Sequence, residues 1–206
     1  MKIFGLLIVV AAIAFGCSNN KTATGLTEIS DTDYKIYSTV IEQLILSQTD
    51  SVPVPSSVGD EVKYMKNDKA NLLLIDSTKA ASSFNWHFTK PFEASLFKDF
   101  FSKNGNRIKL ESKFDNPVKF HLISRSEYVS YMNKGLKAGY ESLYQKYPDV
   151  SGTIEVSRVG YSTKKENAMV IIDFHQNERT GIGYLVELKL ENGVWKILNV
   201  DMMWMA

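Results

Sequence analysis

An excess of charge of one sign is missing from this chain. Its 206 residues include 24 Lys and Arg against 23 Asp and Glu, for a formal net charge of +1 at pH 7, and the basic residues form no run. A nucleic-acid-binding protein needs a concentrated Lys/Arg surface to displace counterions from phosphates. A helix that lies on a membrane surface needs a basic face as well. The composition therefore argues against both, and we expect no nucleic-acid partner.

Residues that carry metal or nucleophile chemistry are also scarce. The chain has three histidines, and none of them lies in an H-E-x-x-H or H-x-H pattern. The G-x-S-x-G turn that presents a serine nucleophile does not occur in the sequence. The sequence therefore predicts no metal and no cofactor, identifies no catalytic residue, and favours a protein that is not an enzyme.

A hydrophobic run long enough to cross a membrane is absent too. After Lys2, the residues from Ile3 to Phe15 carry no polar side chain. As a helix this stretch would be roughly 20 Å long, which is short of the ~30 Å hydrocarbon core of a bilayer. A positive residue followed by such a stretch is typical of a secretory signal peptide.

The only cysteine lies directly after this stretch. The sequence Ala14-Phe15-Gly16-Cys17, followed by polar residues, resembles the lipobox of bacterial lipoproteins. The resemblance implies that a signal peptidase cuts before Cys17 and that its thiol carries a diacylglycerol, so the mature domain has no thiol for a disulfide, a zinc site or a nucleophile. Cleavage after Ala14 at an A-x-A site, which gives simple secretion, is the alternative.

These features divide the chain into three parts. We expect a signal peptide over residues 1–16, a lipidated tether over 17–27, and a single domain over 28–206, which is long enough for one hydrophobic core. The resemblance places the protein in the bacterial cell envelope, anchored by lipid to the outer membrane or on the periplasmic face.

Periodicity and turn signals predict the elements of the domain. Capping boxes at Ser30–Asp33 and Ser124–Glu127 begin two helices, and Asn192-Gly193 predicts a tight hairpin turn. Gly135 and Gly139 weaken the second of these helices in its middle. Helices come first and strands last, which predicts an α+β fold with helices packed on one face of a curved antiparallel sheet that ends in a four-strand meander. The predicted helices cover residues 31–48, 91–103 and 125–147, the predicted strands cover 72–75, 118–123, 153–161, 168–176, 183–190 and 194–204, and a loop covers 51–59.

The C-terminal part carries a second resemblance. The block from Ser151 to Tyr161, with Asn167 to Phe174, Gly181 to Tyr184 and Asn192 to Ile197, is similar to a module of uncharacterised bacterial lipoproteins and secreted proteins. The arrangement also resembles the cystatin-like (nuclear-transport-factor-2-like) superfold. That superfold hosts enzymes and binding modules alike, so the resemblance implies a fold and no activity.

Two places could still carry chemistry. Asp173 and His175 are two residues apart on a predicted strand and share a face, so the carboxylate could orient the imidazole, with Glu178 nearby and Ser157 as a possible nucleophile. A histidine in ordinary strand contacts is the simpler interpretation. Arg158 could bind an anionic ligand through both arms of its guanidinium. A surface pair with Glu155 or Glu187 is the simpler interpretation of this arginine.

The sequence thus favours a lipid-anchored envelope protein that binds another protein or an envelope component and catalyses nothing. The alternative is an envelope hydrolase or small-ligand binder with a pocket between sheet and helices, lined by Arg158, Asp173 and His175. A structure separates the two, because only the second requires these three side chains to converge on one cleft. The methionines around Trp204 are expected to fill the core from the last strand.

Overall fold

The computed structural model describes residues 28–46, 71–80, 92–115 and 120–206. The predicted signal peptide, Cys17, the tether and the loop over 51–59 lie outside the described residues. The helical elements are α1 (Asp31–Val40), which continues as a π-helical segment η1 (Ile41–Leu46), then α2 (Ala94–Lys103), α3 (Arg125–Met132) and α4 (Leu136–Lys146). The strands are β1 (Asn71–Ile75), β2 (Phe120–Ile123), β3 (Val150–Val156), β4 (Gly160–Tyr161), β5 (Asn167–Asn177), β6 (Thr180–Glu191) and β7 (Val194–Met205).

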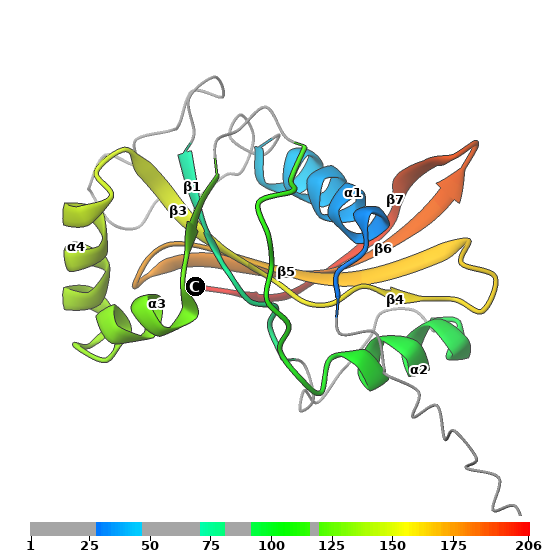
Figure 1. Cartoon of the computed structure of the whole chain (residues 1–206), viewed down its shortest axis with the longest axis horizontal. Helices are drawn as coiled ribbons and strands as arrows, with labels where there is room; N and C mark the ends of the chain where they lie inside the picture. The colour runs from blue at the N-terminus through cyan, green and yellow to red at the C-terminus, as the bar shows by residue number, and fades with distance from the viewer. Residues whose placement is uncertain (1–27, 47–70, 81–91, 116–119) are drawn as a thin grey trace, which may run out of the picture.

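The described strands form one seven-stranded sheet. Its order is β2-β1-β3-β5-β6-β7, with β4 paired to β5 beside β3. Strand β1 runs parallel to β2 and to β3, and every pairing from β3 onward is antiparallel. The predicted α+β class is confirmed, and β3, β5, β6 and β7 form the predicted C-terminal meander (Figure 1).

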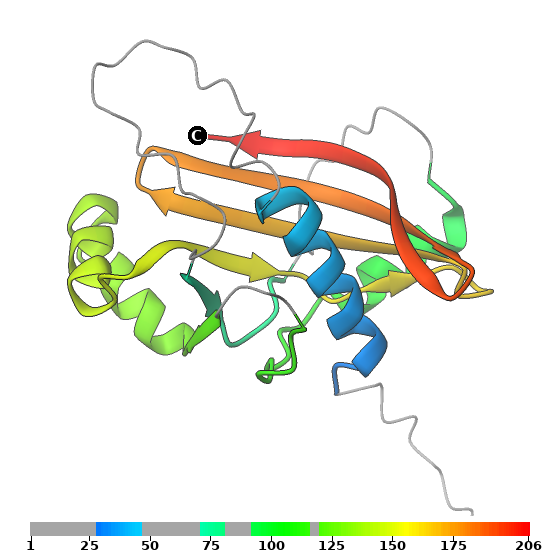
Figure 2. The same ribbon diagram turned by 90° about the horizontal axis from the view of Figure 1, so that it is seen from above.

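Helices lie on both faces of the sheet, whereas the sequence predicted them on one face. Figure 2 shows α1 crossing one face, here called the α1 face, and Figure 1 shows α2 below the opposite face, here called the second face. Leu72 and Leu74 of β1 pack into the core with α1, while Leu73 and Ile75 point the other way and pack with α4. A strand that is apolar at every position exposes hydrophobic surface on both sides, so both faces must be covered.

Helix α1 begins where its capping box predicts. The Ser30 hydroxyl accepts the N–H of Asp33 at 3.2 Å, and the Asp33 carboxylate accepts the N–H of Ser30 at 2.8 Å. The helix then buries Ile36, Tyr37 and Val40 against the sheet. The Tyr37 hydroxyl donates to the carbonyl oxygen of Ser157 at 2.9 Å, which ties α1 to the end of β3.

The helix predicted over 125–147 is two helices. Ser124 caps α3 as expected, but α3 ends at Met132 and α4 begins at Leu136. Gly135 between them has φ +94° and ψ 148°, a backbone conformation that is essentially restricted to glycine. Gly139, the other glycine, packs against the backbone of Tyr131 in α3, so the absence of a side chain lets the two helices approach each other.

The strand predicted over 153–161 is also divided. Strand β3 ends at Val156 and β4 begins at Gly160, because the chain contains one more residue here than the facing part of β5. At this bulge the Ser157 hydroxyl accepts the N–H of Ile171 at 2.8 Å. Among the described residues, no helix is long and apolar enough to cross a membrane.

Candidate functional site

A cluster of charges lies on the second face of the sheet. Glu155 of β3 and Asp173 of β5 are directly opposite each other in the antiparallel ladder. Two carboxylates in this position repel each other unless cations accompany them. Lys79, just beyond β1, forms an ion pair with Asp173, whose side chain is almost fully buried. The indole N–H of Trp204 on β7 donates to the other Asp173 oxygen at 3.0 Å.

Glu155 is neutralised by two arginines from different segments. Nη1 of Arg107, which follows α2, lies 2.7 Å from Oε1 of Glu155. Nη1 of Arg125, the first residue of α3, lies 2.5 Å from the same oxygen. We call Lys79, Arg107, Arg125, Glu155 and Asp173 the charged cluster.

His175 lies beside the charged cluster but is not bonded to it through Asp173. Its ring stacks on Trp204 with 4.7 Å between centroids and 29° between planes. Burial lowers the pKa of His175 below its usual value, and it outweighs the opposing attraction of Asp173 for the protonated form. The prediction that Asp173 and His175 share a face is confirmed by their partners in β3, Glu155 and Thr153. The Asp173 carboxylate, however, binds Lys79 and Trp204 and does not orient the imidazole.

The serine considered as a nucleophile is part of the framework. Ser157 is fully buried, and its hydroxyl accepts the Ile171 N–H and donates to the carbonyl oxygen of Arg158 at 3.1 Å. At the bulge, this hydroxyl takes the place of a backbone acceptor for the Ile171 N–H of β5. Glu178 lies in the turn between β5 and β6.

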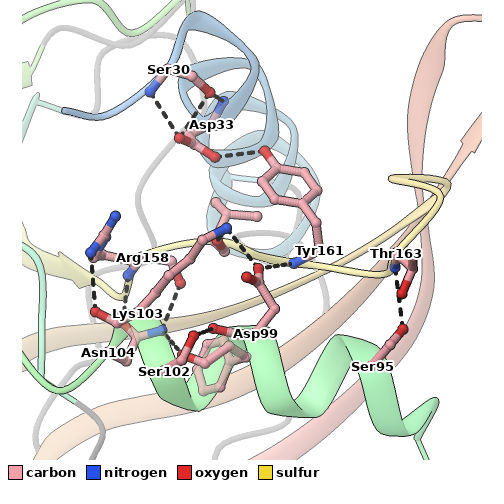
Figure 3. Close-up of polar contacts among 12 residues, drawn as sticks. Ser30, Asp33, Ser95, Asp99, Ser102, Lys103, Asn104, Arg158, Tyr161 and Thr163 are labelled. Carbon is pink, nitrogen blue, oxygen red and sulfur yellow. Dashed lines mark hydrogen bonds and ion pairs between the residues drawn. The ribbon is translucent and has the colours of Figure 1, made fainter. Parts of the chain in front are cut away.

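Arg158 belongs to another part of the molecule, a pocket of about 480 Å³ between the N-terminus of α1, helix α2 and strand β4 (Figure 3). Its Nη1 donates to the carbonyl oxygen of Lys103 at 3.2 Å, and its backbone N–H donates to Oδ1 of Asn104 at 2.8 Å. The expected surface pair of Arg158 with Glu155 or Glu187 is wrong: Arg107 and Arg125 bind Glu155, and Arg158 forms an ion pair with neither glutamate. Asp173 and His175 are not among the residues that line this pocket, so the three predicted ligand residues do not converge.

Several polar and charged groups of the pocket are bonded to one another. The Tyr161 hydroxyl donates to Asp33 at 2.6 Å, and Lys103 pairs with Asp99 at 2.6 Å (Figure 3). The Asp99 carboxylate also accepts the N–H of Tyr161 at 2.7 Å. Burial and the neighbouring Asp33 charge raise the pKa of Tyr161 above its usual value, so it stays a neutral donor. These bonds join α1, α2 and β4.

Sequence reasoning identified Asp173 and His175 but missed the three cations of the charged cluster. Lys79, Arg107 and Arg125 come from three segments that the strand order brings together. The only available signal was the alternation of β3, which places Glu155 on the same face as its partner in β5. The residues next to these three cations in the sequence do not indicate that the three side chains meet in one cluster.

The described residues contain no group of three or more His, Cys, Asp or Glu side chains that could hold a metal ion. In comparisons with known proteins, no family model matches the chain, and neither the curated proteins nor the solved structures contain a match.

Proposed function

We propose that this protein is a lipid-anchored binding protein of the bacterial cell envelope that recognises another protein and catalyses no reaction. The observation that carries the proposal is the edge strand β7, which exposes apolar side chains on both faces of the sheet. Several of its side chains are apolar and exposed: Val194, Met202 and Met205 are each 59 % exposed, and Leu198 is 57 % exposed. The last strand was expected to fill the core, yet of its three methionines only Met203 packs there.

The position of β7 indicates what covers these side chains. It is the last strand in the sheet order and pairs with β6 along its inner edge, from Val194 to Met205. No strand among the described residues pairs with its outer edge. An edge strand with exposed apolar side chains is a site where another polypeptide can add a strand, with backbone hydrogen bonds for affinity and side-chain contacts for specificity. The partner we propose is therefore a protein that contributes an extended segment.

The groups that the sequence offered for catalysis support the non-enzymatic part of the proposal. Ser157, Asp173 and Arg158 are all engaged in hydrogen bonds or ion pairs that hold strands and helices together. The lipid anchor rests on the resemblance of Ala14 to Cys17 to a lipobox.

Site-specific photocrosslinking tests the partner surface. A photoreactive phenylalanine analogue replaces Leu198 or Met202, in separate variants, in cells that make the protein naturally. Leu136 on α4 is the matched control position, because it is 59 % exposed and lies on a helix far along the chain from β7. We expect one and the same crosslinked protein from positions 198 and 202 and none from 136. Absence of a crosslink from β7, or an identical pattern from position 136, contradicts the proposal.

The same cells test the anchor. After fatty-acid labelling, the wild-type protein should carry label and Cys17→Ala should carry none. Label that persists in Cys17→Ala contradicts lipidation at this residue.

The pocket beside Arg158 favours one alternative, a small-ligand binder. Thermal-shift measurements with small anions distinguish it: stabilisation that Arg158→Gln abolishes supports the pocket, and unchanged melting temperatures remove it.

A further inference from the structure

We propose that Arg107 and Arg125 form a binding site for a phosphate group on the second face of the sheet. The site uses none of the β7 side chains on which the partner surface depends, so the two proposals stand or fall separately. It starts from the observation that both guanidiniums approach one carboxylate oxygen, Oε1 of Glu155, at 2.7 and 2.5 Å.

The charged cluster contains more positive than negative charge. Lys79 is paired with Asp173, so two guanidiniums share the single carboxylate of Glu155. A further carboxylate of the described residues, Asp76, contacts Arg125 through the backbone: its Oδ1 accepts the N–H of Arg125 at 2.9 Å. That contact lies at the first turn of α3, where the partial positive charge of the helix end offsets the carboxylate. One positive charge at the arginine pair is therefore not neutralised within the cluster.

Both guanidiniums have more N–H groups than their contacts in the charged cluster use. A guanidinium carries five N–H groups arranged in a planar fork. Besides Glu155, the contact of Arg107 within the described chain is the carbonyl oxygen of Thr78, at 3.1 Å from Nη1. The side chains remain partly in solvent, with exposed fractions of 35 % for Arg107 and 32 % for Arg125. Both arginines can therefore turn further N–H groups toward a ligand from solvent.

A structural role explains one of these arginines but not both. A single guanidinium neutralises Glu155, and bringing a second one to the same oxygen adds repulsion between two cations. An anion with several oxygens removes that repulsion and accepts hydrogen bonds from both forks. A phosphate group fits best, because its oxygens point in different directions and can meet two guanidiniums from separate segments at once.

Isothermal titration of the full-length protein in detergent with inorganic phosphate tests the site. We expect Arg107→Gln and Arg125→Gln each to weaken binding about tenfold or more, since each removes charge-assisted hydrogen bonds. Arg107→Lys keeps the charge but loses the fork and should bind with intermediate affinity. Arg179→Gln, in the exposed turn between β5 and β6, is the matched control and should bind like the wild type.

Glu155→Gln is the decisive variant. It keeps the size of the side chain and removes the internal anion, so phosphate should bind several-fold more tightly. A purely structural cluster predicts the opposite combination, a less stable protein whose phosphate affinity does not change. Circular dichroism of each variant checks that it is folded.

A second arm identifies the source of the phosphate. The titration is repeated in micelles with and without phosphatidylglycerol. Competition by this lipid assigns a lipid headgroup, and unchanged affinity assigns a soluble phosphate compound. If the wild type binds no phosphate in either arm, the proposal is overturned. This holds even if Glu155→Gln binds phosphate, because Glu155 would then occupy the arginines of the natural protein and leave no site for a ligand.

Discussion

At the scale of single residues, Glu187 on β6 shows how its surroundings determine whether an ionised carboxylate destabilises the folded state. Burial is the main cause that raises its pKa above the usual value, and the charges of Asp201 and Glu93 raise it further. A carboxyl group whose pKa is higher in the folded state destabilises that state once it is ionised, so its cost is absent at low pH and grows as pH rises past the unfolded value.

We therefore expect Glu187→Gln to be more stable than the wild type at pH 7. The gain should shrink as pH falls through about 4, the usual pKa of a glutamate, and disappear below it, where the wild-type group is protonated in both states. Urea unfolding at a series of pH values measures the difference. Glu42→Gln, which removes a carboxylate at an exposed position of η1, is the matched control. An equal gain at pH 4 and pH 7 would contradict the argument.

Single residues also show where sequence reasoning stops. The alternation of a strand was enough to place Asp173 and His175 on one face, and this prediction is confirmed. It could not show that Lys79 and Trp204 would take the Asp173 carboxylate, because those partners come from distant parts of the chain. A shared face is a local property, whereas the choice of hydrogen-bond partner depends on the whole strand order.

At the scale of elements, the connection between α3 and α4 depends on the backbone of Gly135. Its φ of +94° with ψ 148° is strained for any other residue, while a Cβ at this position would meet nothing within 4 Å. Gly135→Ala should therefore cost about 1–3 kcal/mol through backbone strain alone. Gly105→Ala, after α2, is a matched control because its Cβ would also meet nothing within 4 Å and its φ is not positive.

Thermal or urea unfolding of the two alanine variants tests this prediction. A loss of stability at position 135 only is expected. Equal effects at both positions would mean that the general flexibility of glycine, and not the φ of Gly135, determines the result.

Elements with a local chemical signal were predictable, and those without one were not. The capping box at Ser30 and the Asn192-Gly193 turn, whose φ values are +51° and +80°, lie where the sequence placed them. The end of α3 was missed because helical periodicity continues across Gly135. The break after Val156 was missed because a bulge depends on the facing strand β5, which the residues of β3 do not reveal.

At the scale of the whole molecule, the sheet is shared between separate groups of buried side chains. Residues of β1 and β5 that alternate along the strand pack with α1 on one face and with α2 or α4 on the other. The sequence indicated the apolar run of β1 but could not show which helix would cover which side. That assignment follows from the connections between elements, which place α2, α3 and α4 together on the second face (Figure 1).

The shared sheet predicts that the domain unfolds as one unit. Leu73 and Leu74 are adjacent and fully buried, yet they belong to cores on opposite faces. Leu73→Ala and Leu74→Ala should each lower the free energy of unfolding by about 2–5 kcal/mol. Leu198→Ala, on exposed β7, should change it by about 0.5 kcal/mol or less.

Urea unfolding followed by tryptophan fluorescence and by far-ultraviolet circular dichroism measures these effects. If one cooperative unit contains both faces, each core variant shifts both signals to the same lower midpoint with an unchanged slope. Fluorescence is followed in a Trp86→Phe/Trp204→Phe background, because Trp204 binds Asp173 on the second face, whereas the remaining Trp195 packs in the core with α1 and reports on that face. A Leu73→Ala variant that shifts the dichroism transition while leaving the fluorescence transition in place would show two units, and would contradict a single domain over residues 28–206.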